Sequence, residues 1–342
     1  MRHLSQLRAR RAGTRVGSRA RNNRSTSAVL LAVMLTFIAG LVGPRTSAQT
    51  VVTINNDDGF DVCTFPTQAQ LAAFYNNTPY WFVNAYFAGA TRACPNQPYL
   101  SGTTLGETEA MGYDVLPTYV GAYAPSGNNL SGCAADRASE TLTTSLNQDF
   151  SMGQSDGQNA ISAATALGLS PYTYNGNYYT FPLYLDVEYF ATSYTDSGVS
   201  CGQIVDKYIE GWISEVLAAG YHAGLYANPG PSPNVYTQYL QNIPSSYWPN
   251  DIWTADFGGT NNVWGISGLP DGDWSNDQRI SQWSHETPSN NCSGGEEDRN
   301  GVCLNIDHDC AIADLAGPNQ QEPPDGENSG ATGEDPHCNT YF

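Results

Sequence analysis

Eight short apolar runs with strand-like composition recur along the chain, and helical or loop stretches separate most of them. The runs cover residues 59–62, 80–87, 114–119, 181–189, 222–226, 251–257, 279–283 and 304–309. Strands that alternate with helices are typical of α/β folds, and eight of them over about 260 residues match the size of a (β/α)₈ barrel. We therefore predict an α/β fold, a TIM-type (β/α)₈ barrel that forms a single domain over residues 49–317.

An open doubly wound sheet is the alternative α/β architecture. Neither a Gly-x-Gly-x-x-Gly sequence nor a phosphate-binding loop follows the first run, so the usual nucleotide-binding signature of that architecture is missing. This absence favours the barrel and predicts no cofactor.

Helix signals occur between several of the runs. Thr67 and Gln70 have the spacing of a capping box, as do Ser200 and Gln203. The predicted helices cover residues 67–75, 157–167, 200–219 and 235–243, and residues 127–147 read as a polar loop.

Both ends of the chain differ in composition from its middle. Residues 1–48 hold nine of the fourteen basic residues and no acidic residue, and an apolar run over residues 28–42 precedes Thr46-Ser47-Ala48. This is the pattern of a secretory signal peptide cut after Ala48, because an apolar run of about fifteen residues is shorter than the roughly 20 needed to span a membrane. Residues 318–342 form a Pro, Gly and acid-rich tail that we expect to be disordered.

The charge of the remaining chain restricts its partners. Residues 49–342 carry 33 acidic residues against five basic ones. Such a surface repels nucleic acid, anionic lipid and acidic wall polymers. We expect a secreted or wall-associated monomer without stable membrane insertion, whose partner is neutral or cationic.

All eight cysteines follow the predicted signal peptide, which is consistent with four disulfides in an oxidising compartment. Spacing suggests only one pair, Cys292 with Cys303, and Cys338 is expected to tether the tail. No Cys-x-x-Cys occurs and the five histidines do not cluster, so no metal site is predicted.

The run over residues 181–189 carries the clearest functional signal. Leu183, Leu185 and Val187 alternate with Tyr184, Asp186 and Glu188, so both acids share one face of a strand. Barrel enzymes place their chemistry at the carboxyl ends of the strands, and acids occur at four such ends: Asp61, Asp186 with Glu188, Asp256, and Asp307. We expect neighbouring carboxylates and partial burial to raise the pKa of Glu188.

A protonated Glu beside ionised Asp residues is the arrangement that glycoside hydrolysis requires. Aromatic side chains at the same strand ends are candidates for stacking on sugar rings. They are Tyr86, Tyr119, Tyr189, Tyr226, Trp253 and Trp283.

Each signal has a structural alternative. One Asp-x-Glu triplet is expected by chance in so acidic a chain, and Asp61 fits equally well as the cap of the following helix. Asp307 and Asp309, which flank His308, also suit solvent or calcium, although the EF-hand spacing is absent. Aromatic residues of barrels are more often part of the core than of a binding surface.

An ordered set of motifs carries a resemblance to a known family. The motifs are Gly59-Phe60-Asp61-Val62-Cys63, Leu185-Asp186-Val187-Glu188, Gly224-Leu225-Tyr226-Ala227-Asn228, Ile252-Trp253-Thr254-Ala255-Asp256, Gln282-Trp283 and Ile306-Asp307. Over about residues 57–316 the chain resembles the glycoside-hydrolase-like family of secreted bacterial proteins called domain of unknown function 1906. That family is similar to the family 25 lysozymes, which cleave peptidoglycan glycan strands on a TIM barrel.

The resemblance implies roles for individual residues. Glu188 matches the lysozyme acid and Asp186 its assisting carboxylate, while Asp61 and Asp307 match the flanking acids. Tyr226 matches a site tyrosine, and Trp253 lies in the matching tryptophan motif. The chain departs from the lysozymes at Asp256, where they usually have a neutral or aromatic residue, and in inserts at residues 127–147 and 261–277.

The sequence thus favours a secreted glycoside hydrolase that acts on a cell-wall or extracellular polysaccharide, with a peptidoglycan-like glycan first among the substrates. The predicted catalytic residues are Glu188, Asp186, Asp61 and Asp307, and the predicted substrate-binding residues are Tyr86, Tyr119, Tyr226, Trp253, Asp256 and Trp283. A catalytically silent barrel that binds wall glycan or has a structural role is the first alternative. An Asp-rich metal-dependent hydrolase is the second.

Overall fold

A computed structural model gives the arrangement of residues 50–51, 54–124, 131–133, 141–174, 177–188, 190–196, 198–230, 234–258, 261–285, 292 and 297–316. The predicted signal peptide, the tail with Cys338, and Tyr189 lie outside these described residues.

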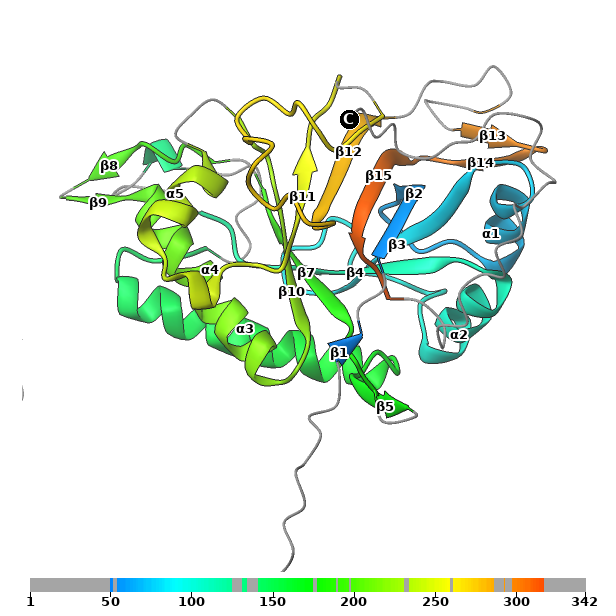
Figure 1. The fold of residues 1–342 in the computed structure, drawn as a ribbon, viewed down its shortest axis with the longest axis horizontal. Coiled ribbons are helices and arrows are strands. Elements are labelled where there is room, and N and C mark those ends of the chain that lie inside the picture. The colour runs from blue at the N-terminus through cyan, green and yellow to red at the C-terminus, as the bar shows by residue number, and fades with distance from the viewer. Residues whose placement is uncertain are drawn as a thin grey trace, which may run out of the picture. The chain divides into compact units, whose positions relative to one another are not determined.

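Eight strands close into one barrel, and each corresponds to one of the eight predicted runs (Figure 1). In barrel order they are β2 (Ile54–Asp61), β3 (Tyr80–Ala88), β4 (Asp114–Val120), β7 (Pro182–Val187), β10 (His222–Ala227), β11 (Asp251–Ala255), β12 (Arg279–His285) and β15 (Asp307–Asp314). Neighbouring strands from β2 to β12 are parallel. The predicted α/β barrel is confirmed.

The last strand departs from an ideal (β/α)₈ barrel because β15 is antiparallel to both of its neighbours, β12 and β2. Asp307 pairs with Asp61 on β2 and with His285 on β12. The expectation that Asp307 lies at the carboxyl end of a strand is therefore wrong. It lies at the amino end of β15, and the reversed direction of β15 brings it to the same rim as the carboxyl ends of the other strands.

Five α-helices lie within the described residues: α1 (Gln68–Tyr75), α2 (Gly102–Met111), α3 (Leu146–Ala166), α4 (Cys201–Ala218) and α5 (Val235–Asn242). The capping boxes at Thr67 and Ser200 are both formed. In Figure 1, α1 and α2 lie on one side of the barrel and α3, α4 and α5 on the other. The described residues between β11 and β12 contain no helix.

Sequence patterning does not predict helix α2, and it predicts helix α3 shorter than the structure has it. Helix α2 buries little more than Leu105 and Thr108, so its apolar periodicity is weak. Helix α3 begins within the predicted polar loop, because its buried face consists of small and acidic residues, Gly153 and Asp156 among them. A Cβ at Gly153 would lie 2.0 Å from the backbone oxygen of Tyr208 on α4, so close helix packing requires glycine there.

The remaining elements are short. They are the strands β1 (Thr50–Val51), β5 (Tyr172–Tyr174), β6 (Asn177–Tyr179), β8 (Thr195–Asp196), β9 (Val199–Ser200), β13 (Glu297–Arg299) and β14 (Val302–Leu304), and the 3₁₀ helices η1 (Ser131–Cys133) and η2 (Ser245–Tyr247). Strand β14, which pairs with β13, contains residue 304 of the predicted last run, so the barrel strand itself begins later than predicted.

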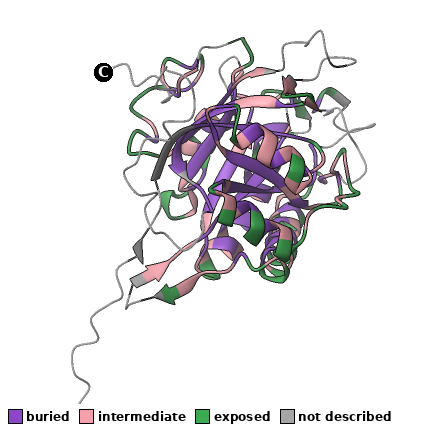
Figure 2. Ribbon diagram, turned by 90° about the vertical axis from the view of Figure 1, so that its right-hand side faces the viewer, coloured by how far each residue is buried: buried purple, intermediate pink, exposed green. Residues whose placement is uncertain are grey.

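The buried residues form an inner core within the barrel and an outer core beneath the helices. Tyr184 of β7 belongs to the inner core, whereas Leu183 and Leu185 belong to the outer core. The predicted alternation along this strand is therefore confirmed. Figure 2 shows the buried residues concentrated on the strands and the exposed residues on the outer sides of the helices. A Cβ at Gly224 would lie 2.3 Å from the ring of Tyr184, so glycine makes room for this large inward side chain.

Three disulfides have both cysteines among the described residues: Cys63–Cys94, Cys133–Cys201 and Cys292–Cys303. The last confirms the predicted pair. Cys310 is also disulfide-bonded. None of the helices in the described part has the length and apolar character required to cross a membrane.

Candidate active site

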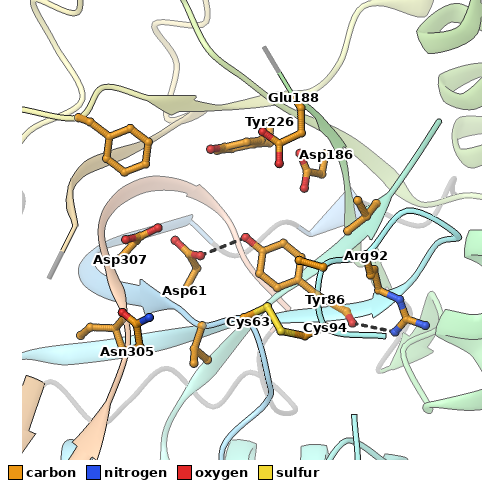
Figure 3. A pocket seen from close by; sticks show the side chains of 15 residues that line it. Asp61, Cys63, Tyr86, Arg92, Cys94, Asp186, Glu188, Tyr226, Asn305 and Asp307 are labelled. Carbon is orange, nitrogen blue, oxygen red and sulfur yellow. Dashed lines mark hydrogen bonds between the residues drawn. A yellow bond between two sulfur atoms is a disulfide. The ribbon is translucent and has the colours of Figure 1, made fainter. Parts of the chain in front are cut away.

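A cavity of about 320 Å³ opens at the rim of the barrel where the parallel strands end (Figure 3). Four carboxylates line it: Asp61 from the end of β2, Asp186 from the end of β7, Glu188 just after β7, and Asp307 from the start of β15. Two tyrosines, Tyr86 from β3 and Tyr226 from β10, also line it. The fold thus gathers acids from three strands into one pocket.

Asp186 and Glu188 form the first acid pair. All six residues of β7 are buried, and the strand pairs on both sides, with Asp186 opposite Val120 on β4 and Tyr226 on β10. Asp186 is buried, whereas Glu188 is half-buried. Strand β7 therefore holds Asp186 within the barrel wall and brings Glu188 to the cavity just beyond its end.

Asp61 and Asp307 form the second pair, and a single amide joins them. Nε2 of Gln282 donates a hydrogen bond to Asp61 Oδ2 at 2.5 Å and another to Asp307 Oδ2 at 3.2 Å. The hydroxyl of Tyr86 donates to Asp61 Oδ1 at 3.0 Å. Figure 3 shows Asp61 beside Asp307, with Asp186 and Glu188 in a second group next to Tyr226.

Burial determines the protonation of Asp61. Burial raises the pKa of Asp61 to about 8, and the charges of Asp307 and, more weakly, Glu188 act in the same direction. The hydrogen bonds from Gln282 and Tyr86 lower this pKa but do not cancel the effect of burial. Asp61 is therefore mainly protonated at neutral pH.

A second buried acid lies next to the pair on the inner side of β15. Asp309 has no solvent exposure, and its Oδ1 accepts a hydrogen bond from Nε1 of Trp253 at 2.9 Å. Burial, together with the charges of Asp61 and Asp307, raises the pKa of Asp309 well above its usual range. Burial also raises the pKa of the Tyr86 and Tyr226 hydroxyls, so both remain hydrogen-bond donors.

Trp253 lies inside the barrel and is absent from the lining of the cavity. It is fully buried, and its ring centroid lies 4.5 Å from that of Tyr226. Trp253 thus supports Tyr226 from within the barrel.

Three further predicted substrate-binding residues do not line the cavity. Tyr119 belongs to the outer core, where its ring centroid lies 6.3 Å from that of Phe87, because it alternates with inward-facing residues of β4. Asp256 follows β11 and is half-buried. Trp283 is the extra residue of a bulge in β12 and packs against His308, with 5.3 Å between ring centroids.

Several residues that sequence reasoning did not assign to the site lie at the cavity or behind it. Arg92, Phe257 and Asn305 line the cavity, and Gln282 holds the acid pair from behind. Arg92 donates from Nε to the backbone oxygen of Gly89 and from a terminal nitrogen to that of Tyr86. Gln282 precedes Trp283 in one of the family motifs, and that position was the only available signal for it.

The described residues include one group with the geometry to hold a metal ion: Cys292, Asp298 and Cys303. The two cysteines form a disulfide, so their sulfurs are not available as thiolate ligands.

Comparison with known structures gives remote matches. An uncharacterized B. stearothermophilus protein is 16% identical, with a TM-score of 0.46, over 75% of this chain and 95% of its own. The Mycobacterium tuberculosis Tat-secreted protein Rv2525c, in complex with L-tartrate, is 12% identical, with a TM-score of 0.42, over 76% and 99%. A GH18 chitinase from Pseudoalteromonas aurantia is 11% identical, with a TM-score of 0.38, over 73% and 85%.

No curated protein matches the chain. A family model does, and its match covers residues 72–302, more than half of the chain. The resemblance carried by the sequence motifs is thereby confirmed. The chain belongs to the Rv2525c-like, glycoside hydrolase-like domain family.

Proposed function

We propose that this protein is a glycoside hydrolase that cleaves a cell-wall or extracellular polysaccharide, with a peptidoglycan-like glycan as the first candidate. One observation carries the proposal: Asp61, Asp186, Glu188 and Asp307 line a single open cavity at the rim of the barrel. Glycosidases require a carboxylic acid and a carboxylate on either side of the scissile bond. The family match supports the same class of reaction.

Glu188 is the general acid of the proposed reaction. Its half-buried position at the cavity allows it to contact the glycosidic oxygen while still exchanging protons with solvent. Glu188 donates its proton to that oxygen as the bond to the anomeric carbon breaks. The carboxylate of Asp186 stabilises the positive charge that develops on the sugar. Water then adds its oxygen to the anomeric carbon and gives a proton to Glu188, which is again ready to act as an acid.

The charge of the cavity indicates the class of sugar. Four acidic side chains line it, and Arg92, the basic residue in the lining, directs its guanidinium to backbone oxygens. An acidic cavity disfavours anionic sugars, so the ring at the cleavage point is neutral or cationic. The cavity volume is about 320 Å³, near the lower end of the range of about 300–1,000 Å³ that is usual for ligand pockets. A cavity of this size accommodates only a small number of sugar rings.

We further propose that the protein is exported as a monomer, with residues 1–48 removed and residues 318–342 left as a tail behind the domain over residues 49–317. The disulfides support export, since disulfides persist in oxidising compartments. Mass spectrometry of the secreted protein tests the cleavage position, and a mature chain that still contains residues 1–48 contradicts it.

The proposed activity is tested by incubating purified wall glycan with the wild-type protein and with Glu188→Gln, and counting new reducing ends. We expect wild type to release them and Glu188→Gln to lose about 10²–10⁴-fold in rate, the usual contribution of general acid catalysis. Glu109→Gln is the matched control, because Glu109 is a half-buried glutamate on α2 outside the cavity.

Two outcomes contradict the proposal. Equal rates for wild type and Glu188→Gln remove Glu188 from the mechanism. Tight glycan binding by both proteins, without product from any glycan tested, identifies a silent binding protein instead.

A further inference from the structure

Gln282 occupies a buried position behind the cavity, where it contacts both Asp61 and Asp307. We infer that Gln282 is a positioning residue whose amide holds these two side chains as one proton-sharing carboxyl pair. The value of this pair to sugar cleavage rests on the proposed function. The proton sharing itself does not, because it follows from contacts within the protein.

The hydrogen bonds of Gln282 fix the direction of its amide. Oε1 accepts from the hydroxyl of Tyr226 at 2.7 Å, while Nε2 donates to the two carboxyl groups. A flipped amide would turn Oε1 toward the two carboxyl groups and Nε2 toward Tyr226, so the pair would lose both of its N–H donors. The side chain is 2% exposed, so water does not readily replace these partners.

The surroundings of Gln282 hold Tyr226 and the amide in place. Gln282 pairs with Asp309 across the ladder between β12 and β15, just before the bulge in β12. Asp309 binds Trp253, and Trp253 packs against the ring of Tyr226. These contacts run from Asp309 through Trp253 and Tyr226 to Gln282, and they connect four strands of the barrel.

The two carboxyl groups lie close together, because one oxygen of each accepts a hydrogen bond from the same nitrogen. Asp61 is buried and Asp307 half-buried, and two neighbouring carboxyl groups in such surroundings do not both ionise readily at neutral pH. The pair therefore carries one proton and one negative charge. Further titratable groups line the cavity or lie beside the pair: Tyr86 from β3, Asp186 and Glu188 from β7, Arg92 after β3, Tyr226 from β10 and Asp309 from β15.

The shared proton limits the charge opposite Glu188. Asp61 and Glu188 interact electrostatically, so the charge that the pair carries acts on the general acid. Gln282 thereby influences the general acid without contacting the sugar.

Carbon-13 NMR of the aspartate carboxyl groups tests the inference on the intact mature protein, with no sugar present. We expect the pKa of Asp61 in the wild-type protein to be about 8. Gln282→Met keeps the length of the side chain but removes both donors, so the pKa of Asp61 should rise by about one to two pH units. Asp307→Asn removes a like charge, so the pKa of Asp61 should fall by about one pH unit or more.

Gln278→Met is the control, because Gln278 precedes β12 at the opposite end of the barrel and binds the backbone oxygen of Asn250. It should leave the titration of Asp61 unchanged. If Gln282→Met does not fold, Tyr226→Phe replaces it, since this variant releases the amide oxygen and should also raise the pKa of Asp61.

An ordinary pKa near 4 for Asp61 in the wild-type protein overturns the inference. It is also overturned if Gln282→Met and Asp307→Asn shift the pKa of Asp61 in the same direction. Because no sugar is involved, a protein that cleaves no glycan can still show the shared proton. Conversely, an active hydrolase whose Asp61 titrates normally removes only the role of Gln282.

Discussion

The two acid pairs of the cavity contain the same chemical groups but differ in how the protein holds them. Asp186 lies near the end of β7 and Glu188 just after it, and Glu188 keeps access to solvent. Asp61 and Asp307 come from the two strands that close the barrel, and Gln282 joins them in a buried position. The difference shows that burial and hydrogen-bond donors, rather than residue type, distinguish the two pairs.

In the proposed mechanism the pair on β7 acts on the glycosidic bond, and the pair at the barrel closure retains a proton and limits the negative charge of the cavity. A carboxyl group that stays neutral should tolerate replacement by an amide, whereas a working carboxylate should not. Each prediction below uses this contrast.

The largest expected effect separates Asp186→Asn from Asp61→Asn. Asp186→Asn removes the charge that stabilises the transition state, so the rate of sugar release should fall by about 10²–10³-fold. Asp61→Asn resembles the protonated side chain present at neutral pH and should cost less than about tenfold. Initial rates on one glycan at pH 6 measure both. Equal losses would show that the two pairs do not have separate tasks.

The second prediction concerns stability and pH. Asp61 has a pKa of about 8 when folded, against an ordinary value of 3.8, so the unfolded chain loses this proton at lower pH than the folded protein. The contribution of Asp61 to the free energy of unfolding is fully present below about pH 4 and is lost as pH rises toward 8. This contribution is on the order of a few kcal/mol.

Thermal unfolding between pH 5 and pH 8 measures this loss. The melting temperature of Asp61→Asn should fall less over this range than that of the wild-type protein. Asp206→Asn is a useful comparison, because burial also raises the pKa of Asp206 on α4, to about 7, at a position outside the cavity. Parallel curves for wild type and Asp61→Asn would contradict the buried proton.

The smallest expected effect is on substrate binding. Phe257 lines the cavity and is 47% exposed, as expected of an aromatic platform for a sugar ring. Phe257→Ala should raise KM several-fold and leave kcat nearly unchanged, since stacking of about 1 kcal/mol acts on bound substrate and transition state alike. Tyr99→Ala is the control, because Tyr99 is equally exposed and lies outside the cavity. A fall in kcat alone would place Phe257 in the chemistry instead.

The sequence made one pair easier to recognise than the other. Asp186 and Glu188 lie two residues apart in a single run, so local alternation was sufficient to place Asp186 on the inner face of a strand and Glu188 at the cavity just after it. Asp307 was assigned to the correct rim for the wrong reason, because the reversed direction of β15 depends on how the barrel closes. No local pattern reports strand direction.

The other differences between the predicted and the observed structure have separate causes. The role of Gln282 depends on partners from β2, β10 and β15, and nothing within β12 indicates them. Gln282 points inward to Asp61, so alternation turns the next residue, Trp283, away from the cavity, and it does the same for Tyr119 on β4. The predicted range of helix α3 is too short because glycine and aspartate, rather than large apolar residues, form much of its buried face.

The most direct test of the proposed site is a crystal structure of Glu188→Gln with an oligosaccharide from peptidoglycan. We predict a glycosidic oxygen about 2.6–3.2 Å from the amide of residue 188, with Asp186 beside the anomeric carbon. Asp61 and Asp307 should remain joined by Gln282 on the opposite side. A sugar bound away from the four acids, or a cavity that stays empty at saturating oligosaccharide, would contradict the account.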